Sequence, residues 1–274
     1  MKNTLRIAAL LTASLSASAA MAALFSEDTV GYRYVASQSE PGVTNKVSKN
    51  VLAFTHFSVD TLGTNFFTID LLKSASNDPA AGGAGGAQEW YGFYQRSLSL
   101  NSLTGNQTGY GFAKDVSLVG RVDAGAKNTA FAPAPRKLRL GVTAAMPIEK
   151  GFWDIGVQAY SESNNNGITK TSVNFKTAPA LVSAWSIPVT DIGTFSGFID
   201  IVGPKGKDGF GVDTATETLA RAKFMFNVMG PKSGLTAGFG IEYWNNKFGN
   251  NNSISFVKNS ARATTPLVLI EYKL

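Results

Sequence analysis

The sequence predicts an all-β fold: a closed antiparallel transmembrane β-barrel of about 12 strands around a polar lumen. Three observations predict it: apolar and polar residues alternate along most of the chain, the alternating segments are even in number, and short connections alternate with long ones. The last segment is the clearest, because Val268, Ile270 and Tyr272 share one face while Leu269 and Glu271 share the other. The 274 residues have a mean hydropathy of +0.00 and, after the first residues, contain no run of about 20 apolar residues. A multi-span helical membrane protein is therefore excluded.

The first 22 residues have the build of a secretory signal peptide. Lys2 and Arg6 form its positive end, residues 7–15 form a short apolar core, and residues 20–22 form a small-x-small cleavage site. The alternative is a buried N-terminal helix. We expect residues 1–22 to be removed and residues 23–274 to form one exported barrel domain.

Twelve segments show the alternation that is typical of strands. They are 29–36, 50–60, 64–73, 88–101, 113–126, 136–147, 151–162, 176–188, 193–203, 218–229, 233–245 and 264–274. The gaps that begin at residues 61, 148, 189 and 230 are short, and most of the others are long, as expected if short turns face the periplasm and long loops face outward. The connection at 102–112 is an exception, because it is longer than the other connections expected to be short periplasmic turns. A soluble β-sandwich has no reason to sort its loops in this way.

Composition excludes several kinds of site. The chain has no Cys and one His, so disulfides, thiolate nucleophiles and multi-histidine metal centres are excluded. Its net charge is +6, but the basic residues are scattered among acidic ones, so we expect no nucleic-acid partner. We also expect no cofactor and no metal.

The cost of charges in lipid predicts which face is the inside. A basic side chain on the lipid face near the midplane costs roughly 2–4 kcal/mol, so the charged face of each strand should line the lumen. In the second and third strands this rule places Phe57 and Phe67 against lipid and His56, Asp60 and Asp70 in the lumen. The charged residues expected to point inward elsewhere are Arg33, Arg121, Asp123, Arg139, Asp200, Arg221, Lys223, Glu242 and Glu271. Paired wall charges that keep a pore wet are the simplest explanation for each of them.

Several short blocks resemble the Tsx-type nucleoside-specific outer-membrane channels and their relatives. They are KNVLAFTHFSVDTLGTNFFTIDLLKS at Lys49, GYRY at Gly31, EWYGFYQRSLSLNSLTG at Glu89, PKGKDG at Pro204 and YWNNKFGN at Tyr243. The resemblance implies a monomeric twelve-stranded barrel with a narrow pore, which passes nucleosides along aromatic and ionisable wall residues. The chain departs from the usual pattern of such barrels at its end, since Leu274 stands where an aromatic residue is common; this bears on its recognition by the barrel assembly machinery.

The leading hypothesis is a diffusion channel for nucleosides or similar small polar solutes in the bacterial outer membrane, and not an enzyme. Aromatic faces would stack a flat base, while ionisable residues would bind the base edge and ribose. The residues predicted to contact the solute in the lumen are Phe54, His56, Asp60, Phe66, Asp70, Arg121, Asp123, Arg139, Arg221 and Glu242.

Two alternatives stay open. His56, Ser58 and Asp70 resemble the His-x-Ser and polar partner of barrel lipases, with Ser58 as nucleophile and His56 as base. Against this, such a triad must face lipid, whereas the alternation places these three residues in the lumen. The other alternative is a general or structural barrel without solute selectivity.

Overall fold

The computed structural model describes residues 23–106, 108–189, 191–230, 232–254 and 256–274; the predicted signal peptide lies outside them. Its strands are β1 (Phe25–Gln38), β2 (Val47–Asp60), β3 (Gly63–Ser74), β4 (Gln88–Ser99), β5 (Asp115–Lys127), β6 (Arg136–Ala145), β7 (Phe152–Asn166), β8 (Thr171–Asn174), β9 (Ala178–Val189), β10 (Gly193–Val202), β11 (Glu217–Asn227), β12 (Leu235–Asn245) and β13 (Arg262–Lys273). All neighbouring strands pair in the antiparallel sense.

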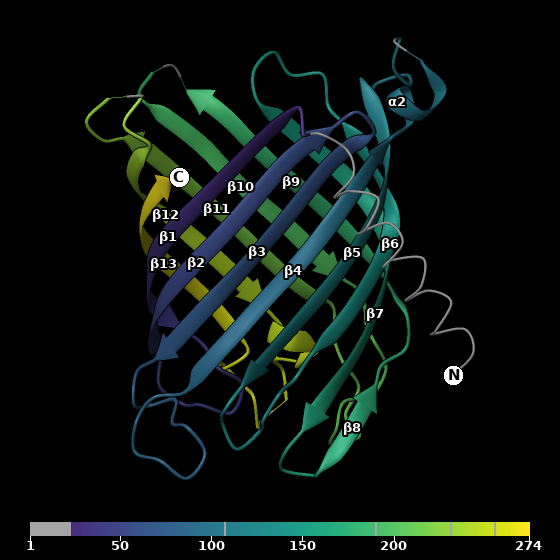
Figure 1. The fold of residues 1–274 in the computed structure, drawn as a ribbon. Helices are drawn as coiled ribbons and strands as arrows, with labels where there is room; N and C mark the ends of the chain where they lie inside the picture. The colour runs from purple at the N-terminus through teal and green to yellow at the C-terminus, as the bar shows by residue number, and fades with distance from the viewer. Residues whose placement is uncertain (1–22, 107, 190, 231, 255) are drawn as a thin grey trace.

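The sheet closes on itself. The strand order is β6-β5-β4-β3-β2-β1-β13-β12-β11-β10-β9-β7-β8. An additional pairing between β6 and β7 closes this sheet into a barrel. Figure 1 shows these strands tilted around a common axis. Twelve strands form the wall, while β8 pairs only with the end of β7 beyond it. The predicted closed antiparallel barrel is confirmed. The strand β8 was not predicted, because the Asn-rich segment at 164–166 that precedes it was expected to belong to a loop.

The two ends of the barrel differ. Short connections, such as 61–62 between β2 and β3, lie at the upper end in Figure 1, where β1 begins and β13 ends; we call this the turn end. Long loops, such as 246–261 between β12 and β13, lie at the other end, which we call the mouth. The long connection between β4 and β5 carries α2 (Leu100–Thr104), which is capped by Ser99 at its start and by Gly105, with φ +72°, at its end. No helix among the described residues is long and apolar enough to cross a membrane.

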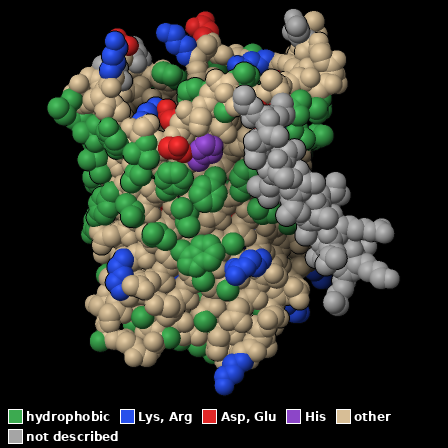
Figure 2. Space-filling model, viewed as in Figure 1, with side chains coloured by type: hydrophobic (Ala, Val, Ile, Leu, Met, Phe, Trp, Pro, Cys, Tyr) green, Lys and Arg blue, Asp and Glu red, His purple; other side chains and the backbone are tan. Residues whose placement is uncertain are grey.

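The outer face of the wall is apolar. Leu52, Leu71, Phe239 and Val268 are 52%, 50%, 60% and 62% exposed there. Figure 2 shows hydrophobic side chains gathered over this surface. An apolar face that is not covered by any other layer of the protein is expected of a barrel whose solvent is lipid.

The lumen face carries the charged residues, and it is densely packed. Arg33, Asp123, Arg139 and Glu242 are all less than a tenth exposed. The predicted polar lumen is thus present, but it also contains an apolar cluster: Val35, Val51, Met225, Leu267 and Leu269. Two wall glycines, Gly238 and Gly240, are the cross-strand partners of Leu269 and Leu267, which gives these side chains room to point inward.

The predicted facing of β2 is wrong. Phe57 lies on the lumen face opposite Phe66, whereas His56 pairs with Phe67 on the outer face. Figure 2 shows the histidine on the outer surface. The cause is the turn: it has two residues, 61 and 62, so Asp60 pairs with Gly63, whereas the sequence predicted a three-residue gap. One residue of turn length moves every side chain of a strand to the opposite face.

Candidate functional site in the lumen

Five ion pairs line the lumen wall, and we call them the ion-pair ring. Its members are Arg33–Asp70, Arg121–Asp123, Arg139–Asp200, Arg221–Glu242 and Lys223–Glu271. The pairs differ in reach. Arg121 and Asp123 are neighbours on β5, whereas Arg139 on β6 reaches across β7 and β9 to Asp200 on β10, with two bonds of 2.9 and 2.7 Å.

One wall adds aromatic rings to these charges. Phe66 on β3 and Phe93 on β4 are stacked with ring centroids 5.5 Å apart and planes 28° apart. The guanidinium of Arg121 lies 3.5 Å from the centroid of the Phe93 ring, and it is held there by Asp123 through bonds of 2.9 and 2.6 Å. This wall therefore offers flat apolar faces beside fixed hydrogen-bonding groups.

Two lumen residues next to this wall were not among the predicted site residues. The Lys137 ammonium lies 3.3 Å from the Tyr91 hydroxyl and 5.0 Å from the centre of its ring. Within the described residues Lys137 has no carboxylate at ion-pair distance, and the Tyr91 hydroxyl donates to Asp123. The signal in the sequence was that Lys137 shares a face with Arg139.

Some buried donors of the ring have no partner of their own. Nε of Arg33 and Nε of Arg139 are buried without a hydrogen-bond acceptor among the described residues. Buried polar groups are normally hydrogen-bonded, so each of these donors marks a place where a buried water could bind.

The structure brings together seven of the ten predicted residues. Phe66, Asp70, Arg121, Asp123, Arg139, Arg221 and Glu242 lie on the lumen face. Phe54, His56 and Asp60 lie on the outer face, because of the facing of β2, so their predicted lumen position is wrong. Contact of the seven with a solute stays a prediction.

On the outer face, polar side chains gather near the turn end. His56 Nδ1 is 2.8 Å from Asp28 Oδ1, and Asp60 binds Arg96 through contacts of 2.8 and 2.9 Å. Charges cost little where the wall leaves the apolar layer, and pairing lowers the cost further. Arg96 shares this face with Leu98 without a bulge in β4.

The hydrolase triad considered as an alternative is not assembled. Asp70 lies on the lumen face, 2.5 Å from Arg33, while His56 and Ser58 face outward. Asp28 takes the place beside the imidazole that Asp70 was expected to fill. The Ser58 hydroxyl oxygen accepts a bond of 3.4 Å from the Asn65 amide.

A second group of charges closes the mouth, and we call it the mouth cluster. It consists of Glu40, Lys49, Asp78, Glu89, Lys127 and Lys247. Glu40 is its centre, since its carboxylate lies 2.8 Å from the ammonium groups of Lys49, Lys127 and Lys247. Lys49 also binds Glu89 at 2.9 Å, and Lys127 binds Asp78 at 2.7 Å.

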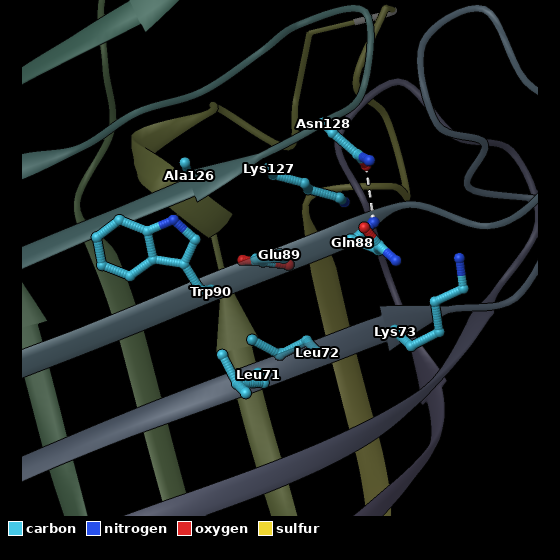
Figure 3. A pocket seen from close by; sticks show the side chains of 9 residues that line it. All are labelled: Leu71, Leu72, Lys73, Gln88, Glu89, Trp90, Ala126, Lys127 and Asn128. Atoms are coloured by element: carbon cyan, nitrogen blue, oxygen red, sulfur yellow. Dashed lines mark hydrogen bonds between the residues drawn. The ribbon is translucent and has the colours of Figure 1, made fainter.

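Figure 3 shows the part of the wall that carries two members of this cluster. Glu89 and Lys127 line a pocket there with Leu71 and Trp90 of the outer face. The backbone N–H of Gln88 donates to the Asn128 side chain over 2.7 Å, which ties the mouth ends of β4 and β5 together.

Electrostatics keeps the centre of the mouth cluster ionised. Burial alone would raise the pKa of the Glu40 carboxyl, but Lys247, Lys49 and Lys127 hold this pKa well below its usual range. Burial lowers the pKa of the Lys247 ammonium, an effect that the attraction of Glu40 offsets only in part.

Comparisons with known proteins support the fold. No family model and no curated protein matches the chain. Among solved structures, the translocator domain of the autotransporter NalP from Neisseria meningitidis is 11% identical over 100% of this chain and 98% of that chain, with a TM-score of 0.52. A KdgM porin is 9% identical over 90% of this chain and 99% of that chain, with a TM-score of 0.46. The NalP likeness shows a shared barrel fold and nothing about activity.

Proposed function

We propose that the protein is a channel of the bacterial outer membrane that passes small polar solutes, with nucleosides as the substrate class. An uncovered apolar outer face and a closed wall suit lipid, because a bilayer tolerates no unpaired sheet edge. Outer-membrane lipid and the barrel assembly machinery are then its partners, and the closed barrel needs no second copy to complete it.

The observation that carries the nucleoside proposal is the aromatic wall of the lumen. The stacked rings of Phe66 and Phe93 offer a face for a base, while Arg121 and Asp123 stand beside them to bind its edge or the ribose. Arg139, the cross-strand partner of Arg121, lies on the same side of the barrel. The sequence blocks that resemble Tsx-type channels point to the same substrate class.

The test is selective flux. We expect adenosine and thymidine to enter liposomes that contain the protein faster than a sugar of similar size. Removing a stacking ring should cost about 1–2 kcal/mol of binding, so Phe66→Ala or Phe93→Ala should raise the half-saturating nucleoside concentration about tenfold. Phe239→Ala is the matched control, because this ring is 60% exposed on the outer face. Equal flux of nucleosides and sugars would reduce the proposal to a general channel, and no flux at all would leave a structural barrel.

One observation favours a second candidate, a lipid hydrolase. His56 and Ser58 face outward two residues apart on β2, and Asp28 holds Nδ1 of the imidazole at 2.8 Å. In this arrangement Ser58 Oγ would attack an ester carbonyl and pass its proton through His56 Nε2 to the leaving alcohol, and water would then release the acid. Loss of ester hydrolysis in Ser58→Ala, with hydrolysis kept in Thr55→Ala on the lumen face, would establish this activity; an inactive wild type in phospholipid micelles would remove it.

A further inference from the structure

We propose that Glu40 is the residue that determines charge selectivity at the mouth, where its carboxylate makes the entrance electrically neutral and favours uncharged solutes. This inference rests on the proposed channel function. It concerns residues that the nucleoside proposal does not use, since the mouth cluster lies at the loop end of the barrel and the aromatic wall lies deeper in the lumen.

Glu40 joins parts of the chain that are far apart in sequence. It lies two residues after the end of β1, and its three lysine partners come from the start of β2, the end of β5 and the 3₁₀ turn η1 (Lys247–Gly249). The preceding residue of the same loop, Ser39, makes further hydrogen bonds to distant parts of the chain. Lys247 donates to the Ser39 carbonyl over 3.0 Å, and the Ser39 hydroxyl donates to the Arg262 carbonyl over 2.5 Å.

The group is buried although it consists of charges at an open end of the wall. The side chains of Glu40, Lys49 and Lys247 are 5%, 5% and 2% exposed. Such burial means that the segments 39–46 and 246–250 fold inward over the lumen. The contacts across the mouth agree, since Lys247 of the second loop reaches both Glu40 and Ser39 of the first. A solute that enters from this end therefore meets the mouth cluster.

The charges of the cluster balance. Lys49, Lys127 and Lys247 contribute three positive charges, and Glu40, Asp78 and Glu89 contribute three negative charges. Of the carboxylates, Glu40 alone binds all three lysines, so its loss removes an ion-pair partner from each of them. Because the group is desolvated, a single unpaired charge acts on a passing ion with little screening.

A neutral, cross-linked entrance discriminates by charge. A free anion would have to displace Glu40 from its lysines, and a free cation would have to displace a lysine from its carboxylates. An uncharged solute displaces neither the carboxylate nor a lysine, and it can exchange hydrogen bonds with the polar groups that it passes. A nucleoside belongs to this class, whereas a nucleotide does not.

The test is ion selectivity in planar bilayers, measured as the reversal potential in a KCl gradient. Glu40→Gln should raise the chloride-to-potassium permeability ratio about fourfold, because one positive charge is left unpaired. Lys247→Gln should move the ratio by a similar factor in the opposite direction. The double variant Glu40→Gln/Lys247→Gln, which restores the balance, should return within about twofold of the wild type.

Controls separate this effect from general charge and from misfolding. Asp213→Asn makes the same change of charge on an outer loop where the side chain is 78% exposed, and it should leave the ratio unchanged. Heat-modifiable mobility on gels reports whether each variant forms the barrel, and the opposite sign expected for Lys247→Gln keeps the test decisive if Glu40→Gln does not assemble. An unchanged ratio in folded Glu40→Gln, or an equal shift in Asp213→Asn, would overturn the role of Glu40 alone. No current from any of the proteins would overturn the channel function and this inference with it.

Discussion

At the scale of single residues, the pair Arg139–Asp200 joins strands that lie further apart than those of any other pair in the ion-pair ring. It reaches across two intervening strands, and its side chains are 3% and 17% exposed. Removing one partner of a buried pair leaves the other charge without compensation, and this is more costly than removing both.

We therefore expect Asp200→Asn to lower the free energy of unfolding by about 3 kcal/mol. The double variant Arg139→Met/Asp200→Asn should lose clearly less than the sum of the two single variants. Urea unfolding in phospholipid vesicles measures each value, and Asp213→Asn in the exposed pair with Lys207 should change it by less than about 0.5 kcal/mol. Additive losses in the double variant would contradict the coupling.

At the scale of elements, the turn between β2 and β3 decides which side chains enter the lumen. The Asp60 carboxylate accepts bonds from the backbone N–H of Leu62 and Gly63 at 2.9 and 3.1 Å, and this fixes the two-residue turn. Gly63 has φ +152°, and a Cβ there would lie 2.0 Å from the Ser97 carbonyl oxygen. Only glycine meets both conditions.

Gly63→Ala should consequently destabilise the barrel by about 2 kcal/mol, through backbone strain and the clash with β4. Gly120→Ala is the control, because a Cβ at Gly120 meets only Leu140 Cδ2 at 3.7 Å; we expect a change within about 0.5 kcal/mol. The same vesicle unfolding assay compares the two variants. Equal stability of Gly63→Ala and the wild type would show that the turn can relax.

This turn also shows where prediction from the sequence ended. Alternation located all twelve wall strands, because lipid outside and polar groups inside impose a period of two on each strand. It does not report turn length to a single residue, and an error of one residue placed His56 and Asp60 inside. Asp70 and Phe66 on β3 were placed correctly, so the two-residue turn alone would have assigned Phe57 to the lumen.

At the scale of the whole molecule, loops that are far apart in the sequence contact each other at the mouth of the barrel. Glu40 and Lys247 are 207 residues apart in sequence and 2.8 Å apart in space. Pattern reading cannot find such a contact, since no periodicity relates one loop to another. The mouth cluster was therefore missed, and the predicted strands at 50–60 and 113–126 stop one residue short of Lys49 and Lys127.

The mouth cluster makes conduction depend on pH in one direction. The pKa of Glu40 is held well below its usual range, because its three lysines outweigh the effect of burial. A carboxyl whose pKa is lowered by folding stabilises the folded arrangement above its unfolded pKa of about 4.3, and this contribution is lost as the pH falls through the folded pKa. The loop contacts around Glu40 should thus persist in mildly acidic solution.

We expect single-channel conductance to stay constant from about pH 8 to about pH 5, and to rise only well below the usual range of a glutamate, as the mouth loops separate. Glu40→Gln should lack this rise, because its side chain does not titrate, and its conductance should already be high at neutral pH. Recordings across this pH range in planar bilayers measure both proteins. A rise in the wild type centred near or above about pH 4.3 would contradict the lowered pKa, and an identical rise in Glu40→Gln would assign the transition to another group. The wall itself should survive the change, because backbone hydrogen bonds close it all the way round and do not titrate.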